Sequence, residues 1–289
     1  MQILSHIVKK DWLRISQMTC HDASQKLCTP GTGESSVALT PGADAIYQGV
    51  LQQMVRAEGT ANERPVKTAA MGLSFGGHWS TKLTMKGLVD CGINIGGPLG
   101  FTPFDAGFFN NLPYGMPGII GNALRLARLP DDALVNTMFT GFSRKTLGLL
   151  DPGRKIPPLL AINGAQDQYI PRLETEGLRA FPSAEVWLVK GATHCAAEKL
   201  PRYIPAVIAW LRVQLHGDTA GNRLALAAGK ALLPPLLNNL SEKSIPPKIF
   251  RLVDFPHCPV GDLFHVQLVF AWAVLQTLSG LSGVVPRYT

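Results

Sequence analysis

Gly72-Leu73-Ser74-Phe75-Gly76 is the stretch of sequence that decides the fold, because it reads G-x-S-x-G. A short apolar run, residues 68–71, precedes it and predicts a buried strand, and a helix-compatible stretch follows at residues 77–86. Strand, tight turn and helix in this order form the context that a nucleophile elbow requires. The serine then sits in a strained turn whose neighbours must be small. The pattern predicts a nucleophile at Ser74 if catalytic partners follow downstream.

Two further strand candidates each lead into a loop that carries a partner for Ser74. The run 158–162 leads into Asn163-Gly164-Ala165-Gln166-Asp167, and the run 185–189 leads into Lys190-Gly191-Ala192-Thr193-His194. The order Ser, Asp, His, with each residue on a loop after a strand, is typical of α/β-hydrolases. The sequence therefore predicts an α/β-hydrolase fold, with a mostly parallel sheet, helices on both faces and a triad of Ser74, His194 and Asp167.

The three residue types divide the chemistry of acyl transfer between them. A serine hydroxyl needs a base to take its proton during attack, and His194 suits this role because an imidazole titrates near ~6.5. Asp167 would orient the imidazole and stabilise its charged form. The backbone N–H of Phe75, the residue after the nucleophile, is the predicted oxyanion donor. This chemistry needs no cofactor, and none is expected.

Other residues compete for two of these roles. Asp151 is the main rival of Asp167 for the role of the acid. Asp167 could also be an ordinary aspartate of a turn or a helix cap. The histidines that compete with His194 are His78, His216 and His257. The first lies too close to Ser74 in the sequence to be its base, and the second ends a predicted helix. The loop position after a strand favours Asp167 and His194.

Composition and charge restrict the class of protein and its partners. The 289-residue chain is 46% hydrophobic and 16% charged, which is typical of a globular protein with a sizeable core. Its net charge of +7 is spread along the sequence without a basic run, so nucleic-acid binding is not expected. The five cysteines form no C-x-x-C pair or zinc pattern, and no secretory signal is recognised. We therefore expect a cytoplasmic protein without a metal site.

An uncharged run near the C-terminus leaves two interpretations open. Residues 264–285 carry no charge, and ~20 apolar residues suffice to span a membrane. The run also contains His265, Gln267 and Gln276, which favour a helix that packs on the catalytic domain over a membrane anchor. No pattern indicates the oligomeric state.

The chain divides into three segments. Residues 1–29 form an atypical N-terminal segment, residues 30–216 the catalytic domain, and residues 217–289 a C-terminal extension of unknown role. The catalytic domain is expected to end in a core helix at residues 200–215, which has a broad apolar face.

An insertion at about residues 99–152 follows the predicted strand 89–95 and is interpreted as a lid over the nucleophile. Helical patterns occur in it near residues 119–129 and 131–142. Its large apolar side chains are Phe101, Phe104, Phe108, Phe109, Met116, Met138 and Phe139. They suit a hydrophobic acyl or ring substrate, or else they bury the insertion against the sheet, and both interpretations stay open.

Further motifs resemble the FrsA-like esterase branch of the α/β-hydrolases. They are Pro30-Gly31-Thr32-Gly33-Glu34-Ser35, the elbow extended by Gly77, the segment 163–171 and the segment 191–195. The resemblance spans about residues 29–215 and implies esterase activity without a cofactor, with Ser74, Asp167 and His194 in the roles given above. It also implies an alternative, because related fungal enzymes use the same triad to hydrolyse a C–C bond next to a carbonyl in polyketides. The implied partner is a small-molecule ester or polyketide.

The front of the chain departs from that family pattern. Family members carry a glycine-containing turn upstream of P-G-T-G-E-S that provides the second oxyanion donor, whereas residues 1–30 contain no glycine. Cys28-Thr29 stand where an aspartate is expected, and residues 9–17 resemble a polar helix. We therefore expect a truncated or rearranged N-terminal part. Loss of one oxyanion donor costs about 2.7–4 kcal/mol of transition-state stabilisation, so a weak or inactive relative is a further hypothesis.

Overall fold

The computed structural model describes residues 2–3, 27–28, 30–31, 35, 37–59, 67–100, 109–113, 115–127, 133–134, 139–151 and 153–237. All of them belong to one unit of the chain. The uncharged run 264–285 and the predicted polar helix at residues 9–17 lie outside the described residues. No helix within the described ranges is long and apolar enough to cross a membrane.

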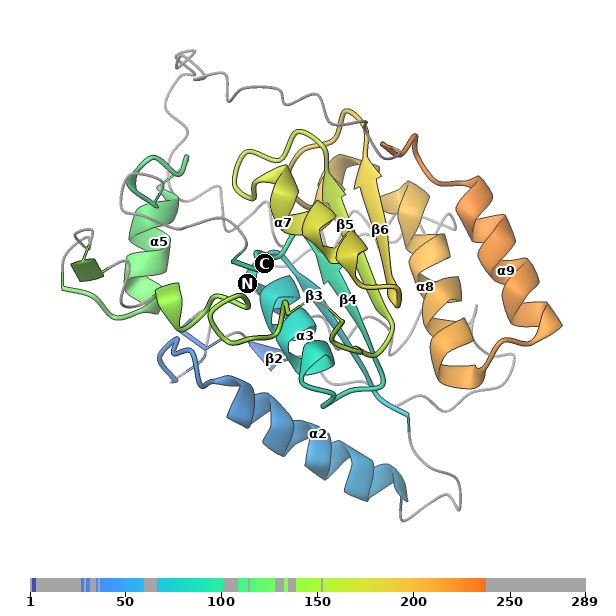
Figure 1. Ribbon diagram of the computed structural model, residues 1–289, viewed down its shortest axis with the longest axis horizontal. Coiled ribbons are helices and arrows are strands. Elements are labelled where there is room, and N and C mark those ends of the chain that lie inside the picture. Colours follow the sequence, from blue (N-terminus) through green and yellow to red (C-terminus); the bar gives the residue numbers. More distant parts are fainter. Residues whose placement is uncertain are drawn as a thin grey trace, which may run out of the picture. The chain divides into compact units, whose positions relative to one another are not determined.

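Four parallel strands form the central sheet in the order β3–β4–β5–β6 (Figure 1). They are β3 (Ala69–Leu73), β4 (Cys91–Ile95), β5 (Leu159–Gly164) and β6 (Ala184–Val189). The register pairs Leu73 with Ile95 and Gly164 with Val189, so the carboxyl ends of the strands meet at one edge. The mostly parallel sheet predicted from the sequence is confirmed.

An aromatic core joins two helices to one face of the sheet. These helices are α2 (Asp44–Gly59) and α3 (Phe75–Met85). Tyr47 of α2 and Trp79 of α3 are buried with ring centroids 5.5 Å apart, and they pack with Ala70 of β3. This packing holds the N-terminus of α3, and with it the elbow, against the sheet.

The C-terminal helices continue the same unit. Helix α8 (Leu200–His216) contacts β4, and α9 (Ala220–Ala231) packs on α8 (Figure 1). Leu236 then forms an antiparallel bridge with Val189 of β6, and the Leu237 N–H donates to the Leu188 carbonyl oxygen at 2.8 Å. β4 and β5 are buried along their whole length, which is typical of parallel strands with both faces covered.

The insertion between β4 and β5 differs in part from its prediction. The helix expected near residues 119–129 is α5 (Met116–Ala123), which begins earlier and ends earlier. Pro117 fits the first turn of a helix, and Arg125 adopts a φ of 56°, which stops the helix from continuing. The second pattern, residues 131–142, lies partly outside the described residues.

Gly31 of the P-G-T-G-E-S motif packs directly on the end of α5. Its φ is 76°, and a Cβ at this position would collide with the carbonyl oxygen of Ala123. The Gly31 N–H donates to the Val37 carbonyl oxygen at 2.6 Å, and the Leu39 N–H donates to the Ala123 carbonyl oxygen at 3.1 Å. The motif therefore requires glycine here because the backbone of the insertion comes so close.

Two smaller elements complete the described fold. Helix α7 (Arg172–Glu176) is followed directly by a 3₁₀ turn, Gly177–Ala180. In the N-terminal segment, β1 (Gln2–Ile3) pairs antiparallel with β2 (Leu27–Cys28) in a separate two-stranded sheet. The other residues of the predicted segment 1–29 lie outside the described part of the chain.

Candidate active site

Ser74 occupies the sharp turn between β3 and α3. Its φ of 54° and ψ of −125° are unusual for a residue with a side chain and cost about 1–3 kcal/mol. The Ser74 N–H donates to the Ile95 carbonyl oxygen at 2.7 Å, and the Gly77 N–H donates to the Ser74 carbonyl oxygen at 2.8 Å. A Cβ at Gly72 would collide with the carbonyl oxygen of Gly76. The turn therefore has the strained, glycine-dependent geometry that the G-x-S-x-G pattern predicts.

His194 lies between Ser74 and Asp167. Its Nε2 is 2.8 Å from the Ser74 Oγ, and its Nδ1 is 2.8 Å from the Asp167 Oδ2. A carboxylate can only accept a hydrogen bond, so Nδ1 carries a proton and donates a hydrogen bond to Asp167. In the neutral imidazole, Nε2 is then the acceptor for the serine hydroxyl. The structure thus brings the three residues singled out in the sequence into one hydrogen-bonded chain.

Asp167 is surrounded by hydrogen-bond donors. Its Oδ1 accepts from the N–H groups of Tyr169 at 2.7 Å and Ile170 at 3.1 Å. Its Oδ2 accepts from the Asn163 Nδ2 at 2.8 Å as well as from His194. Only 1% of the Asp167 side chain is exposed. Two donors on each oxygen fix the carboxylate in place and satisfy it as a buried acceptor.

A strained turn presents His194. Cys195 has a φ of 60° and Ala196 a φ of 47°, so two successive residues with side chains are left-handed, at about 1–2 kcal/mol each. The Tyr203 hydroxyl donates to the Cys195 carbonyl oxygen at 2.9 Å, and the Cys195 Sγ donates to the Ile95 carbonyl oxygen at 3.3 Å. The backbone at Cys195 is therefore not extended. Its bonds hold the turn beside the sheet.

The ionisation of His194 depends on opposing influences. Burial lowers the pKa of the imidazole, whereas Cys195 and the Asp167 carboxylate raise it, so the net pKa lies above its ordinary value. The neutral form is the one that accepts the serine proton. Reactions that use His194 as a base are therefore expected to accelerate as the pH rises from neutral into the alkaline range.

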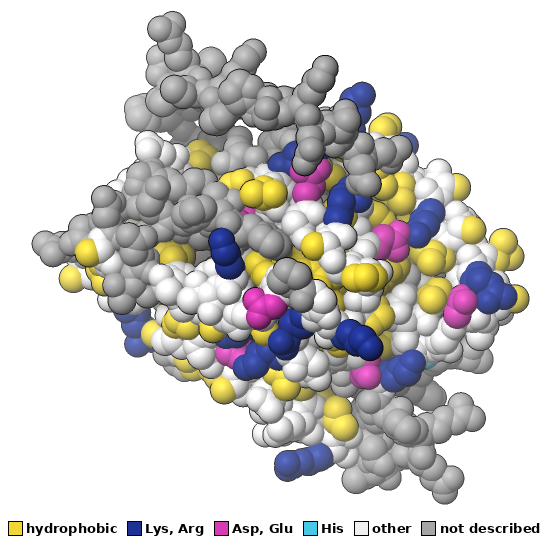
Figure 2. All heavy atoms as spheres, in the orientation of Figure 1, with side chains coloured by type: hydrophobic (Ala, Val, Ile, Leu, Met, Phe, Trp, Pro, Cys, Tyr) yellow, Lys and Arg dark blue, Asp and Glu magenta, His cyan; other side chains and the backbone are white. Residues whose placement is uncertain are grey.

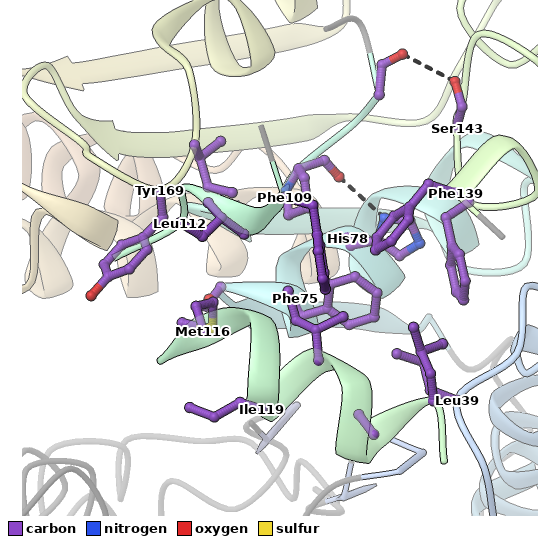
Figure 3. A pocket seen from close by; sticks show the side chains of 18 of the residues that line it. Leu39, Phe75, His78, Phe109, Leu112, Met116, Ile119, Phe139, Ser143 and Tyr169 are labelled. Carbon is purple, nitrogen blue, oxygen red and sulfur yellow. Dashed lines mark hydrogen bonds between the residues drawn. The ribbon is translucent and has the colours of Figure 1, made fainter. Parts of the chain in front are cut away.

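An apolar cavity opens beside Ser74 and His194 (Figure 3). It contains about 1030 Å³ of empty space, part of it open to solvent. In Figure 3, Met116 and Ile119 of α5 form one wall, and the side chain of Phe75 lies opposite. The remaining lining residues are Leu39, His78, Pro98, Gly100, Phe109, Leu112, Ile120, Ala123, Leu124, Phe139, Phe142, Ser143, Tyr169 and Ile170. Most of the lining side chains are therefore apolar, and the polar ones are those of Ser74, His78, Ser143, Tyr169 and His194.

The competing residues lie elsewhere or have other contacts. Asp151 is exposed and lines no part of the cavity, and His216 is exposed at the end of α8. His78 lines the cavity, but its Nδ1 donates to the Pro98 carbonyl oxygen at 3.2 Å. Burial and the nearby Arg144 hold the pKa of His78 well below its usual range. His257 lies outside the described residues.

Phe75 begins α3, so its N–H has no acceptor within the helix. It donates to none of the described backbone or side-chain groups. That leaves this N–H available to a negatively charged oxygen next to Ser74. The turn in which a second donor was expected falls within residues 1–29, which are almost entirely outside the described part of the chain.

Asn163 is a site residue that the sequence reasoning missed. It is fully buried at the end of β5, and it contacts Asp167 directly. The available signal was a polar residue at the end of an otherwise apolar strand, four residues before the predicted acid. A polar group at such a position must find partners, and here one partner is the acid itself.

Within the described ranges, no group of three or more His, Cys, Asp or Glu side chains is arranged to hold a metal ion. On the face shown in Figure 2, the blue basic side chains are interspersed with the magenta acidic ones.

Comparison with known proteins places the fold. No family model matches the sequence, and no curated protein matches it. Among solved structures, the chain is similar to AbyA5, with a TM-score of 0.53 and 16% identity over 71% of this chain and 57% of AbyA5. It is also similar to 2,6-dihydroxy-pseudo-oxynicotine hydrolase, with a TM-score of 0.51 and 16% identity over 68% of this chain and 54% of that one. The chain thus spans little more than half the length of these neighbours.

At these identities the likeness concerns the fold, and the resemblance to the FrsA-like branch still rests on the sequence motifs. The parallel strand order and the position of the site agree with the fold of the neighbours, since ligands of open α/β sheets bind outside the carboxyl ends of the strands. The chain therefore has the α/β-hydrolase fold.

Proposed function

We propose that this protein is a serine hydrolase that cleaves carboxylic esters, with Ser74 as nucleophile, His194 as general base and Asp167 as the residue that orients the imidazole. The observation that carries the proposal is the pair of 2.8 Å hydrogen bonds that joins these residues beside an apolar cavity. A serine hydroxyl bonded to a neutral imidazole nitrogen is the arrangement that nucleophilic attack requires.

The reaction would proceed through an acyl-enzyme. Ser74 Oγ attacks the ester carbonyl while its proton moves to the Nε2 of His194, and Asp167 stabilises the resulting imidazolium. The Phe75 N–H donates to the oxyanion of the tetrahedral intermediate. The imidazolium then gives its proton to the departing alcohol. In the second half, His194 takes a proton from water, whose oxygen attacks the acyl carbon. The imidazolium then returns the proton to the Ser74 Oγ as the acyl–oxygen bond breaks, which releases the acid and free Ser74.

The cavity supports an apolar acyl group as the substrate class. Phe109, Phe139 and Phe142 line it together with aliphatic side chains, and no Asp, Glu, Lys or Arg is among the lining residues. A charged acyl group would lose its hydration there without gaining an ionic partner. An uncharged small molecule with a hydrophobic acyl group is the partner that fits.

Hydrolysis of a C–C bond next to a carbonyl, in a β-dicarbonyl polyketide, is the second candidate. The cavity favours it through its rings, because Phe75 lies 5.9 Å from Phe142 and Phe139 lies 6.2 Å from it, centroid to centroid. Such a set of tilted rings offers faces and edges to a flat aromatic substrate. The same triad serves both reactions, so parallel screening of esters and β-dicarbonyl compounds distinguishes them.

Fluorophosphonate labelling combined with turnover of p-nitrophenyl butyrate tests the proposal. Wild-type protein is expected to be labelled on Ser74 and to hydrolyse the ester. Ser74→Ala should lose the label and at least ~10⁴-fold in kcat, because no other group supplies the nucleophile. Ser183→Ala is the matched control, since Ser183 Oγ bonds the Ile156 carbonyl oxygen away from the site.

Two outcomes would contradict the ester hydrolase. If Ser74→Ala turns over the ester as fast as wild type does, Ser74 is not the nucleophile. If folded wild type is labelled but hydrolyses neither esters nor β-dicarbonyl compounds, the weak or inactive relative replaces the proposal.

A further inference from the structure

A buried asparagine joins the acid of the site to the backbone beside the base. Asn163 is 0% exposed at the end of β5, and its Nδ2 donates to the Asp167 Oδ2 at 2.8 Å. Its Oδ1 accepts from the N–H of Gly164 at 2.8 Å and from the N–H of Cys195 at 2.9 Å. Cys195 directly follows His194 in the chain. One amide therefore contacts both loops that carry the proposed acid and base.

These bonds determine the orientation of the amide. Oδ1 faces two N–H donors, which use both of its lone pairs, and Nδ2 faces a carboxylate oxygen. Rotation of the amide by half a turn would set oxygen against the carboxylate and NH₂ against two N–H groups. A buried site cannot satisfy that arrangement, so only one orientation is compatible with the neighbours.

We propose that Asn163 is a positioning residue that fixes Asp167 and His194 relative to each other for proton transfer, an inference that rests on the proposed function. Asp167 Oδ2 accepts from both Asn163 and His194, so the amide sets where this oxygen lies. The bond to the Cys195 N–H anchors the left-handed turn that presents His194. Misplacement of a reacting group by ~1 Å can cost about 10²-fold in rate.

The neighbouring strand provides a matched control. Asn94 of β4 is also buried, at 3% exposed, and its side chain also bonds the main chain. Its Nδ2 donates to the Gly97 carbonyl oxygen at 3.1 Å, and its Oδ1 accepts from the Gly97 N–H at 2.6 Å. None of these bonds reaches Ser74, Asp167 or His194. Asn94→Ala therefore removes a comparable buried amide without removing a contact to the triad.

The first test compares Asn163→Ala with Asn94→Ala in the full-length chain. Both variants are expected to melt at a lower temperature than wild type. Per folded molecule, Asn163→Ala should lower kcat for p-nitrophenyl butyrate by about 10- to 100-fold with KM nearly unchanged, because a hydrogen bond to a charged group is lost. Asn94→Ala should lose clearly less. Equal losses of kcat in the two variants would contradict a positioning role.

The second test uses Asn163→Asp, which keeps an acceptor for Gly164 and Cys195 but replaces the donor to Asp167 by a second carboxylate. The added negative charge stabilises the imidazolium. In the pH profile of the fluorophosphonate labelling rate, the acid limb should therefore move to higher pH. The downfield proton NMR resonance of His194 Nδ1–H should shift as well. Superposition of both quantities on those of wild type would overturn the proposal.

The two hypotheses fail separately. Wild-type protein that is not labelled at any pH would refute the serine hydrolase. The NMR resonance of His194 in Asn163→Asp would still decide whether Asn163 positions the Asp167–His194 pair, because it requires no turnover.

Discussion

The two halves of the site are built in opposite ways. The polar half comes from the loops after β3, β5 and β6, where hydrogen bonds of 2.8 Å join Ser74, His194 and Asp167. The apolar half comes largely from the insertion between β4 and β5, whose rings of Phe109, Phe139 and Phe142 line the cavity. Hydrogen bonds depend on exact position, whereas apolar contact tolerates changes of shape. Chemistry and selectivity should therefore respond separately to mutation.

After removal of the nucleophile itself, the largest effect is expected from breaking the polar half at Asp167. In Asp167→Asn the amide no longer holds the His194 proton on Nδ1, so kcat/KM should fall by about 10³–10⁴-fold. Asp167 raises the pKa of His194, so the residual activity should also show its acid limb at lower pH than wild type. The pH dependence of kcat/KM for p-nitrophenyl butyrate measures both effects.

Asp151→Asn is the control, because Asp151 is the rival in the sequence and is exposed away from the cavity. It should change kcat/KM by no more than about twofold, as is usual for surface substitutions. A large loss in Asp151→Asn together with an active Asp167→Asn would reverse the assignment of the acid.

An intermediate effect is expected from the apolar half. Phe139→Ala removes a ring whose centroid lies 5.6 Å from that of Phe109, and so enlarges the cavity. The ratio of kcat/KM for p-nitrophenyl octanoate to that for the acetate should fall by about tenfold, since lost apolar contact of a few methylenes is worth ~1–3 kcal/mol.

Labelling of Phe139→Ala by a small fluorophosphonate should remain close to the wild-type rate, because the triad is intact. Leu173→Ala, at an exposed residue outside the cavity, is the matched control and should leave the chain-length ratio unchanged. An unaltered ratio in Phe139→Ala would mean that the acyl group binds elsewhere.

The smallest effect on activity is expected from the scaffold that supports both halves. Asp44 of α2 is buried and accepts from Lys82 of α3 at 2.7 Å and from Lys86 at 2.6 Å. Burial raises the pKa of Asp44, but the two lysines lower it, and the net pKa lies below 3.8. Asp44→Asn leaves Lys82 buried without its anion and should cost about 3–5 kcal/mol of unfolding free energy at pH 7.

The folded pKa of Asp44 is depressed, so its contribution is present above pH 3.8 and is lost as the pH falls through the folded pKa. Urea unfolding should thus show a smaller difference in unfolding free energy between wild type and Asp44→Asn at about pH 3 than at about pH 7. Glu185→Gln, in the partly exposed pair with Lys230, should cost no more than ~1 kcal/mol. A difference that does not depend on pH would contradict the ionic account.

Much of the fold and the core of the site followed from local sequence patterns. The four strands lie where short apolar runs predicted them, because buried parallel strands are apolar on both faces. The helix limits in the insertion were predicted wrongly. The apolar pattern predicted a helix to residue 129, whereas α5 ends at Ala123, because the left-handed backbone of Arg125 stops it from continuing. Asn163 was missed because its role depends on a hydrogen bond to Cys195, which is 32 residues away.

The sequence by itself determined a strand–turn–helix with a serine in its turn, and an aspartate and a histidine that follow later strands in the order of an α/β-hydrolase. Such signals are local, because glycine spacing and apolar periodicity act within one element. Only the tertiary structure decided that Ser74, His194 and Asp167 meet, that Asn163 joins two of their loops and that the insertion lines an apolar cavity. Those relations depend on strand order and register, which bring together residues that are distant in the chain.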